Sequence, residues 1–204
     1  MKNVTMTAKE MLELFCAGID EGRNILCNPF NQGEYTYATN GHFAIRFPKI
    51  EGYDVEGAPD IEKVWPKAIP TEEQWVDIPD IENIECECCD GKGIGYICPD
   101  CEGRSRILFT SEYGYEYSVE CRMCNGTGNI KAKCKDCMGT GRASTVDNVN
   151  IKGTLFDANL LIVLKLLPCV KIAPEAVKKY TAVPFKFDGG EGLIMPKRGY
   201  DNEH

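Results

Sequence analysis

Four copies of the pattern Cys-x-x-Cys-x-Gly, which we call knuckles, lie between residues 86 and 141 of this chain. Two intervening residues let both sulfurs of a knuckle reach one tetrahedral ion, and the glycines let the backbone turn tightly around it with positive φ. Closed sets of four thiolates suit zinc, and no redox role is evident. The pattern therefore predicts two zinc ions, held by eight of the twelve cysteines.

Two other uses of these cysteines are disfavoured. An iron–sulfur cluster also takes four thiolates, but the repeated glycine-rich form favours zinc knuckles. Disulfides are disfavoured because we expect a reducing cytoplasm. The first residues lack the features of a secretory signal, and the longest apolar run, residues 160–164, is too short to cross a bilayer, so we expect no membrane association.

The four knuckles resemble the cysteine-rich zinc domain of DnaJ-type chaperones, over residues 86–142. In that family the first and fourth knuckles share one zinc and the second and third share the other. A β-hairpin joins the second and third, and residues 106–119 fit it. Ser105 replaces the last glycine of the second knuckle. The resemblance implies a first centre and a second centre, made respectively of Cys86, Cys89, Cys134 and Cys137, and of Cys98, Cys101, Cys121 and Cys124.

The J-domain of DnaJ-type chaperones has no counterpart in the sequence. There is no His-Pro-Asp loop, and the two histidines are His42 and His204, so stimulation of an Hsp70-type ATPase is not implied. Of the remaining cysteines, Cys16 and Cys169 flank apolar helices and are expected in the core. Cys88 lies inside the first knuckle, and it is a spare exposed cysteine, a reactive thiol or an alternative zinc ligand.

The two ends of the chain repeat one order of elements, β-α-β-β-β. The first copy reads as strands at 2–6, 24–28, 34–39 and 42–47, with a helix that begins in a capping box of Thr7 and Glu10. The second reads as a strand at 148–154, a helix from Asp157 to Leu167, and strands at 169–173, 180–187 and 192–195. We therefore predict an α+β fold made of a duplicated unit that is split by the zinc insert.

This repeat resembles one domain of a bacterial DNA-polymerase sliding clamp, over residues 1–50 and 145–198. Residues 38–42, Ala-Thr-Asn-Gly-His, are similar to the family's ATDGH turn, and residues 192–198 to its C-terminal VMPMR strand. A clamp chain has several such domains and this chain has one, so a ring would need an oligomer. The predicted domains are 1–50 plus 143–204, and 86–142, with 51–85 between them.

Residues 51–85 are strongly acidic. They hold eleven Asp and Glu against Lys63 and Lys67, and they contain both tryptophans, Trp65 and Trp75. We interpret this segment as a linker or covering loop with patches of local order. An alternative is that it mimics nucleic acid in the basic groove of a partner.

Charge and motifs then limit the function. The formal net charge is −8, and two Zn(Cys)4 centres bring it to about −12, which does not favour nucleic acid. There is no Walker loop, HExxH motif or nucleophile elbow, so we expect no enzyme and no catalytic residue.

Our hypothesis is a protein-binding adaptor or inhibitor, of the kind that phages or mobile elements encode for replication or defence, with Tyr113, Tyr115 and Tyr117 as contacts. The alternatives are chaperone-like binding of unfolded chains and nucleic-acid binding. The latter would use the basic residues of the zinc module, namely Arg104, Arg106, Arg122, Lys131, Lys133 and Lys135.

Overall fold

The computed structural model describes residues 6–18, 24–66, 69–178 and 181–198. The chain divides into two units, which we describe separately. The split unit comprises Met1–Glu82 and Ser144–His204, and the cysteine unit comprises Asn83–Ala143. Residues 51–82, interpreted above as a linker or covering loop, are thus part of the split unit.

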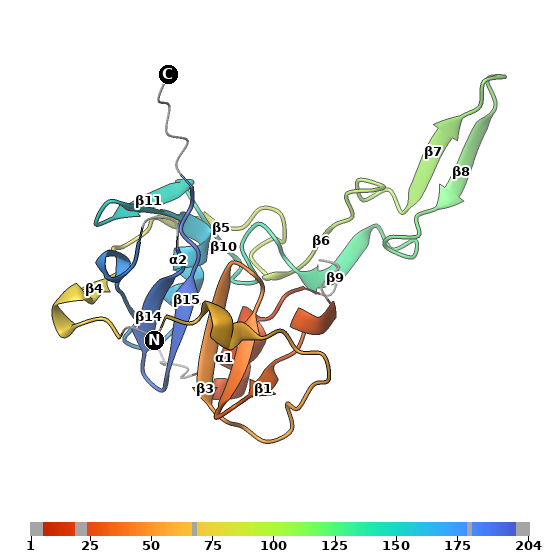
Figure 1. Cartoon of the computed structure of the whole chain (residues 1–204). Helices are drawn as coiled ribbons and strands as arrows, with labels where there is room; N and C mark the ends of the chain where they lie inside the picture. The colour runs from red at the N-terminus through yellow and green to blue at the C-terminus, as the bar shows by residue number, and fades with distance from the viewer. Residues whose placement is uncertain (1–5, 19–23, 67–68, 179–180, 199–204) are drawn as a thin grey trace. The chain divides into compact units, whose positions relative to one another are not determined.

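The split unit is built on one seven-stranded antiparallel sheet with the order β1-β2-β3-β15-β14-β13-β4 (Figure 1). Each end of the chain supplies three neighbouring strands, and β3 and β15 join the two sets through pairs such as Phe43 with Ile194. The strands are β1 (Phe30–Gln32), β2 (Tyr35–Thr39), β3 (Phe43–Pro48), β4 (Val76–Asp77), β13 (Lys171–Ile172), β14 (Val183–Phe187) and β15 (Gly190–Ile194).

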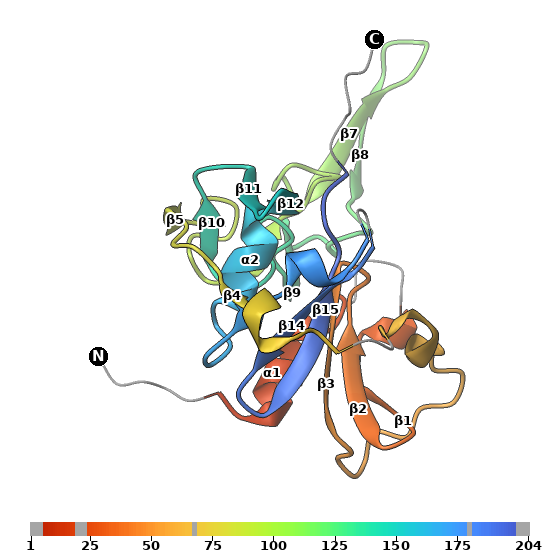
Figure 2. The same ribbon diagram turned by 60° about the vertical axis from the view of Figure 1, so that its left-hand side comes forward.

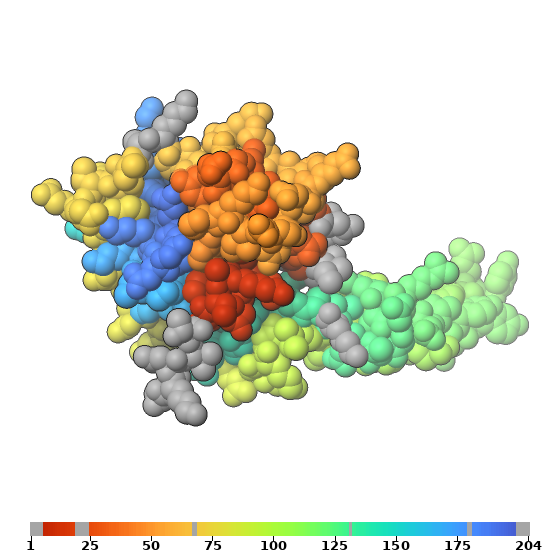
Figure 3. All heavy atoms as spheres, turned by 90° about the horizontal axis from the view of Figure 1, so that it is seen from below, coloured from red at the N-terminus to blue at the C-terminus, as the bar shows by residue number. Residues whose placement is uncertain are grey.

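Helix α1 (Ala8–Phe15) begins in the predicted capping box, in which Thr7 and Glu10 satisfy each other's backbone N–H groups. The helix packs against β2 and β3. Its Phe15 is fully buried, with its ring centroid 4.5 Å from that of Phe43 and 6.3 Å from that of Phe185. The space-filling view shows this helix, in red, lying against the orange β1–β3 region (Figure 3).

Helix α2 (Ala158–Leu164) is buried along its whole length, as its apolar sequence requires. The carboxylate of Asp157 caps it by accepting from the N–H groups of Asn159 and Leu160. The prediction of a single strand at 148–154 is wrong, because that stretch begins a hairpin of β11 (Asn148–Ile151) and β12 (Thr154–Asp157). Lys152 and Gly153 both have positive φ and form its turn.

Other predicted strands differ from the structure. Residues 24–28 contain the short 3-10 helix η2 (Asn24–Leu26), and the edge strand β1, which follows Pro29, was not predicted. Strand 169–173 shrinks to β13, because Cys169 takes a left-handed backbone with φ of 52° that breaks the extended run. The strand at 2–6 falls outside the described residues, except for Met6, which is not in a strand.

The acidic segment contributes short elements and anchors to the split unit. These are the 3-10 helices η3 (Ile61–Val64) and η4 (Glu72–Gln74) and the edge strand β4. Ile61 is buried against Phe30 and Tyr37. Segment 51–82 therefore covers part of the sheet, as its apolar residues among the acids permit.

The side chain of Arg46 contacts Trp65 at the end of η3. The guanidinium of Arg46 lies 4.1 Å from the ring centroid of Tyr35 and 4.2 Å from that of Trp65, and it pairs with the carboxylate of Glu191. Because Trp65 belongs to the acidic segment and Glu191 to β15, this contact ties three distant parts of the sequence together.

The cysteine unit consists of three two-stranded sheets with the knuckles between their strands (Figure 1). They pair β5 (Asn83–Glu85) with β10 (Arg142–Ser144), β6 (Ile94–Ile97) with β9 (Asn129–Lys133), and β7 (Arg106–Thr110) with β8 (Glu116–Glu120). Figure 2 shows β7 and β8 as a narrow ribbon that ends in a turn. In the described part of the chain, no helix has the length and apolar character that a bilayer crossing requires.

Candidate metal centres and binding surfaces

The backbone of each knuckle turns sharply after its second cysteine. The residue there has positive φ, between 48° and 53°, although none of the four is glycine. The next residue is a glycine that also has positive φ, and in three knuckles its N–H donates to the carbonyl of the first cysteine at 3.0 Å. The non-glycine residues that accept this strain are Asp90, Glu102, Asn125 and Met138.

The turns bring eight cysteines together in two buried groups of four. In each group the sulfur atoms lie within 4.8 Å of one another. The first centre holds Cys86, Cys89, Cys134 and Cys137, and the second holds Cys98, Cys101, Cys121 and Cys124, the sets that the resemblance implies.

The spacing of the sulfurs matches a zinc tetrahedron. A Zn–S bond of about 2.3 Å gives a tetrahedron with edges of about 3.8 Å. The Sγ–Sγ distances between knuckles are 3.9 and 3.7 Å in the first centre and 3.7 and 3.7 Å in the second. Donor type, number and spacing therefore fit two zinc ions, one in each group.

The surrounding backbone favours thiolates. The N–H groups of Gly93, Gly128 and Gly141 donate to the sulfurs of the second cysteines in their knuckles at 3.2 to 3.3 Å. Although burial opposes ionisation of Cys124, the Gly128 N–H and neighbouring sulfurs lower its pKa to about 7. Burial raises the pKa of Cys134 to about 12. Because burial opposes negative charge, a cation is what allows four such thiolates to share one centre.

Glycine is required at three of the four knuckle ends. A Cβ on Gly93 would collide with the carbonyl oxygen of Gly139, one on Gly141 with that of Gly91, and one on Gly128 with that of Gly103. At the fourth end Ser105 adopts φ of 64°, a conformation that favours glycine. The second centre thus contains one strained residue that has no counterpart in the first.

Cys88 is a ninth cysteine beside the centres. It is half-buried and packs against both groups of cysteines. Burial raises the pKa of the Cys88 thiol, while hydrogen bonding with Cys134 lowers it and hydrogen bonding with Asp136 raises it.

The β7–β8 ribbon has two unlike faces. Alternation along paired strands places Ile107, Phe109, Tyr117 and Val119 on one face, with the Phe109 and Tyr117 rings stacked at 5.2 Å. The opposite face carries Leu108 among polar residues. Phe109, Tyr117 and Val119 are each close to half exposed, and Tyr115, just before β8, is 66% exposed. We call Phe109, Tyr115, Tyr117 and Val119 the aromatic face.

Two of the basic residues proposed for nucleic acid are paired within the cysteine unit. Arg104 pairs with Glu102, and Arg106 donates across the ribbon to Ser118. The Lys131 side chain lies outside what the structure describes, and Arg122 is exposed. Three acidic residues of the ribbon, Glu112, Glu116 and Glu120, are close in sequence to these basic residues.

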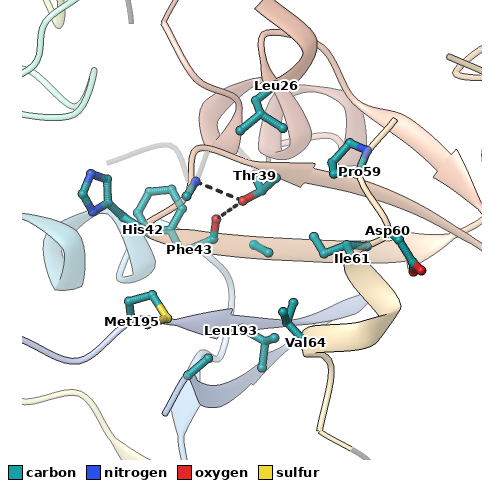
Figure 4. A pocket seen from close by; sticks show the side chains of 13 residues that line it. Leu26, Thr39, His42, Phe43, Pro59, Asp60, Ile61, Val64, Leu193 and Met195 are labelled. Atoms are coloured by element: carbon teal, nitrogen blue, oxygen red, sulfur yellow. Dashed lines mark hydrogen bonds between the residues drawn. The ribbon is translucent and has the colours of Figure 1, made fainter. Parts of the chain in front are cut away.

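A separate apolar pocket of about 320 Å³ lies in the split unit (Figure 4). Its apolar lining comes from η2, β3, η3 and β15 and includes Leu26, Phe43, Ile61, Val64, Leu193 and Met195. His42, the last residue of the 38–42 turn, lies at its edge with its ring directed away from the space. No sequence pattern could indicate this pocket, because its walls come from four distant segments.

The cysteines outside the knuckles divide differently from the prediction. Cys16 is buried, and its thiol donates to the carbonyl of Leu12. Cys169 is exposed, so its placement in the core was wrong. Cys169 has a left-handed backbone, and the carboxylate of Asp188, in the turn between β14 and β15, raises the pKa of its thiol.

No family model matches the chain. Two solved structures are similar to it at low scores. The C. crescentus β sliding clamp is 10% identical, and the match covers 91% of this chain and 57% of that one with a TM-score of 0.27. The Thermotoga maritima DNA polymerase III β subunit is 11% identical, and the match covers 81% of this chain and 42% of that one with a TM-score of 0.24. These TM-scores are too low to establish a shared fold. The clamp-like arrangement stays a prediction.

Curated relatives match through a short stretch. The chain is 35% identical over 77 residues to the chaperone protein DnaJ of Wolbachia sp. subsp. Brugia malayi, covering 35% of this chain and 20% of that protein. It is 40% identical over 65 residues to the DnaJ-related protein SCJ1 of Saccharomyces cerevisiae, covering 28% of this chain and 17% of that protein. The chain thus spans about a fifth of the length of these relatives. With the two four-cysteine groups, these matches support a DnaJ-type cysteine-rich zinc domain in this protein.

Proposed function

We propose that this protein is a non-enzymatic adaptor that binds other proteins, with the cysteine unit as a zinc-stabilised docking module. The observation that carries this proposal is the aromatic face. Phe109, Tyr117 and Val119 stand close to half exposed on one face of a two-stranded ribbon, and Tyr115, just before β8, is 66% exposed. Exposed aromatic residues that lie together are the typical core of a protein-binding surface.

The pocket of the split unit supports an adaptor rather than a module with a single surface. Val64 is 63% exposed and Met195 is 43% exposed at its rim, and its interior is mostly apolar. Apolar side chains of a partner segment fit such a space. A protein with one apolar site in each unit can hold two partners.

The zinc centres support a structural role for the metal. Each holds four sulfur ligands, and a catalytic zinc keeps a coordination position open for water or substrate. Among the described residues, neither four-cysteine group includes a histidine or carboxylate ligand. We therefore propose that zinc organises the ribbon and takes no part in a reaction.

Chaperone-like binding is the second candidate, and the DnaJ-type relatives favour it. The two candidates predict different partners for the same face. An adaptor holds one or a few folded proteins, whereas a chaperone-like module holds many unfolded chains of mixed sequence.

A photo-crosslinking amino acid at position 109 tests both in the full-length chain inside its own cells. We expect one or a few discrete adducts, identified by mass spectrometry. A broad smear that grows on heat shock would favour the chaperone-like role, and adducts to nucleic acid alone would contradict both. The same reagent at position 108, on the opposite face, is the matched control.

Substitutions that place a negative charge at the rim of the pocket test its role separately. We expect Val64→Asp and Met195→Asp each to weaken co-purification of a second partner, one that does not crosslink at position 109, at least tenfold while the zinc content stays the same. Val55→Asp is the control, because Val55 is 38% exposed and does not line the pocket. Equal binding by all three variants would remove the pocket from the proposal.

A further inference from the structure

The β7–β8 ribbon has two edges along which backbone groups point away from the ribbon (Figure 2). In the part of the chain that the structure describes, β7 and β8 pair only with each other. A two-stranded ribbon is marginally stable in water by itself, and the unpaired N–H and C=O groups of its edges can pair with a further strand. The ribbon is therefore a place where this protein can gain a strand.

Hydrogen bonds at the two ends of the ribbon identify the groups that face outward. The N–H of Ser111 donates to the carbonyl of Tyr115 at 2.8 Å, and the N–H of Cys121 donates to the carbonyl of Ser105 at 3.0 Å. Because bonded and non-bonded pairs alternate along an antiparallel ladder, every second pair between these ends is non-bonded. The outward N–H and C=O groups are therefore those of residues 106, 108 and 110 on β7 and of residues 116, 118 and 120 on β8.

The two edges are not equally open. On the β8 edge, Nη2 of Arg106 donates to the carbonyl of Ser118 at 2.8 Å, and Nε donates to the Ser118 hydroxyl. The Arg106 side chain thus lies across the ribbon and covers the middle of the β8 edge. On the β7 edge, the outward backbone groups of Leu108 and Thr110 have no partner among the described residues, and the Leu108 side chain is 63% exposed. The open edge is therefore β7.

The sequence of β7 is complementary to itself. In an antiparallel pairing of two copies centred on Leu108, this residue lies opposite its own copy. Arg106 then lies opposite Thr110, and the outward groups of all three residues form the bonded pairs. Ile107 lies opposite Phe109, so apolar side chains meet on one face, and the two Leu108 side chains meet on the other. A second copy of β7 therefore satisfies both the backbone and the side chains of this edge.

The β8 edge has no such self-complementarity. The equivalent pairing of two β8 strands about Ser118 places Glu116 opposite Glu120 twice, and like charges that face each other across paired strands are destabilising. In the β7 pairing no like charges face each other, because the charged residue of β7 is Arg106 and it faces threonine. Charge and backbone exposure thus favour the same edge.

We propose that two copies of this chain pair along β7 about a twofold axis at Leu108, so that two ribbons form one four-stranded antiparallel sheet. The outer strands of this sheet are the two copies of β8, whose edges Arg106 covers. Residues opposite each other in a sheet share a face, so the two aromatic faces lie on the same side and form one wider surface. The shared edge is short, and the dimer is therefore reversible. This inference does not depend on the proposed binding of other proteins.

Sedimentation equilibrium of the full-length, zinc-loaded chain over a range of concentrations tests the pairing. We expect a concentration-dependent dimer, and Leu108→Lys should weaken it at least tenfold because like charges then meet at the axis. Leu166→Lys is the matched control, because Leu166 is an exposed leucine of the split unit. A wild-type chain that stays monomeric at every concentration would overturn the proposal, as would a dimer that Leu108→Lys leaves intact or that both variants weaken equally.

Proline substitutions separate the two edges of the ribbon. Leu108→Pro and Ser118→Pro each remove one outward N–H and none of the hydrogen bonds between β7 and β8. We expect the first variant to lose the dimer and the second to keep it, with two zinc ions bound in both. Loss of the dimer from Ser118→Pro would overturn the assignment to β7, whether or not Leu108→Pro also loses it.

Crosslinking in cells identifies the occupant of the edge. A photo-crosslinking amino acid at position 108 should join the chain to itself, at twice its mass, whereas position 109 reports on the aromatic face. Adducts of other proteins at position 108 would show that a strand of a different partner takes the edge, and the dimer would be overturned. If position 109 gives no protein adducts while position 108 joins two copies, the proposed adaptor function fails and the dimer stands.

Discussion

The two units are held together by different means. The largest fully buried side chains of the split unit are aromatic and aliphatic, among them Phe15, Tyr37 and Phe185. Among the described residues of the cysteine unit, the buried hydrophobic side chains are the eight ligands with Tyr96 and Ile130. A unit of that size with so little buried hydrocarbon depends on its metal, whereas the split unit folds around an ordinary apolar core.

Removal of zinc should have the largest effect on the difference in stability between the two units. Structural zinc contributes on the order of 10 kcal/mol per site, so a strong chelator should unfold the cysteine unit and leave the split unit folded. Both tryptophans, Trp65 and Trp75, belong to the split unit, and their fluorescence reports on it alone. We expect lost β-sheet signal in circular dichroism with unchanged tryptophan emission. A change in emission that follows zinc loss would mean that the two units unfold together.

The reverse perturbation is Phe15→Ala. This fully buried residue contacts the rings of Phe43 and Phe185, and its truncation should cost the split unit about 3–5 kcal/mol. Urea unfolding followed by tryptophan fluorescence measures the loss, and the zinc content should not change. The control is Lys9→Ala on the same helix, where an exposed pair with Glu13 is worth at most about 0.5 kcal/mol.

A smaller effect is expected within the cysteine unit from Gly141→Ala. The new Cβ would collide with the carbonyl oxygen of Gly91, and the strain should cost about 3 kcal/mol. Zinc affinity of the first centre should then fall by roughly a hundredfold in a chelator competition. Gly114→Ala is the control, because Gly114 also has positive φ but a Cβ there meets open space. Equal affinities for the two variants would show that the close backbone approach is not important.

The smallest expected effect is a gain in stability from Ser105→Gly. Relief of the left-handed strain at this position should stabilise the cysteine unit by about 1 kcal/mol at fixed free zinc. Thermal unfolding by circular dichroism measures the gain. Ser105→Ala removes the hydroxyl but keeps the strain, so an equal gain in that variant would assign the effect to the hydroxyl instead.

Local patterns in the sequence were reliable guides in both units. The capping box at Thr7 and the ribbon around Gly114 are confirmed, and two zinc ions fit the observed groups, because each feature depends on residues close in sequence. The Asn40-Gly41 turn likewise joins β2 to β3. Short-range chemistry determines these elements almost without help from tertiary structure.

Long-range contacts explain what sequence patterns missed. Strand β4 forms because Val76 pairs with Ile172, almost a hundred residues later. The pocket needs four separate segments, and nothing in any one of them indicates it. The hairpin at 148–157 was missed for another reason: Lys152-Gly153 is a weaker turn signal than the Asn-Gly and Asp-Gly pairs.

The two-stranded sheet β5–β10 has a consequence for how this protein can vary. Arg142 donates through Nε and Nη2 to the side chain and carbonyl of Asn83, at 2.9 Å each, so the chain enters and leaves the knuckle region at neighbouring positions. A short loop could therefore bridge the gap that remains if the residues between them are deleted. At the level of the gene, one insertion or deletion would add or remove the whole metal-binding region without shifting any other strand.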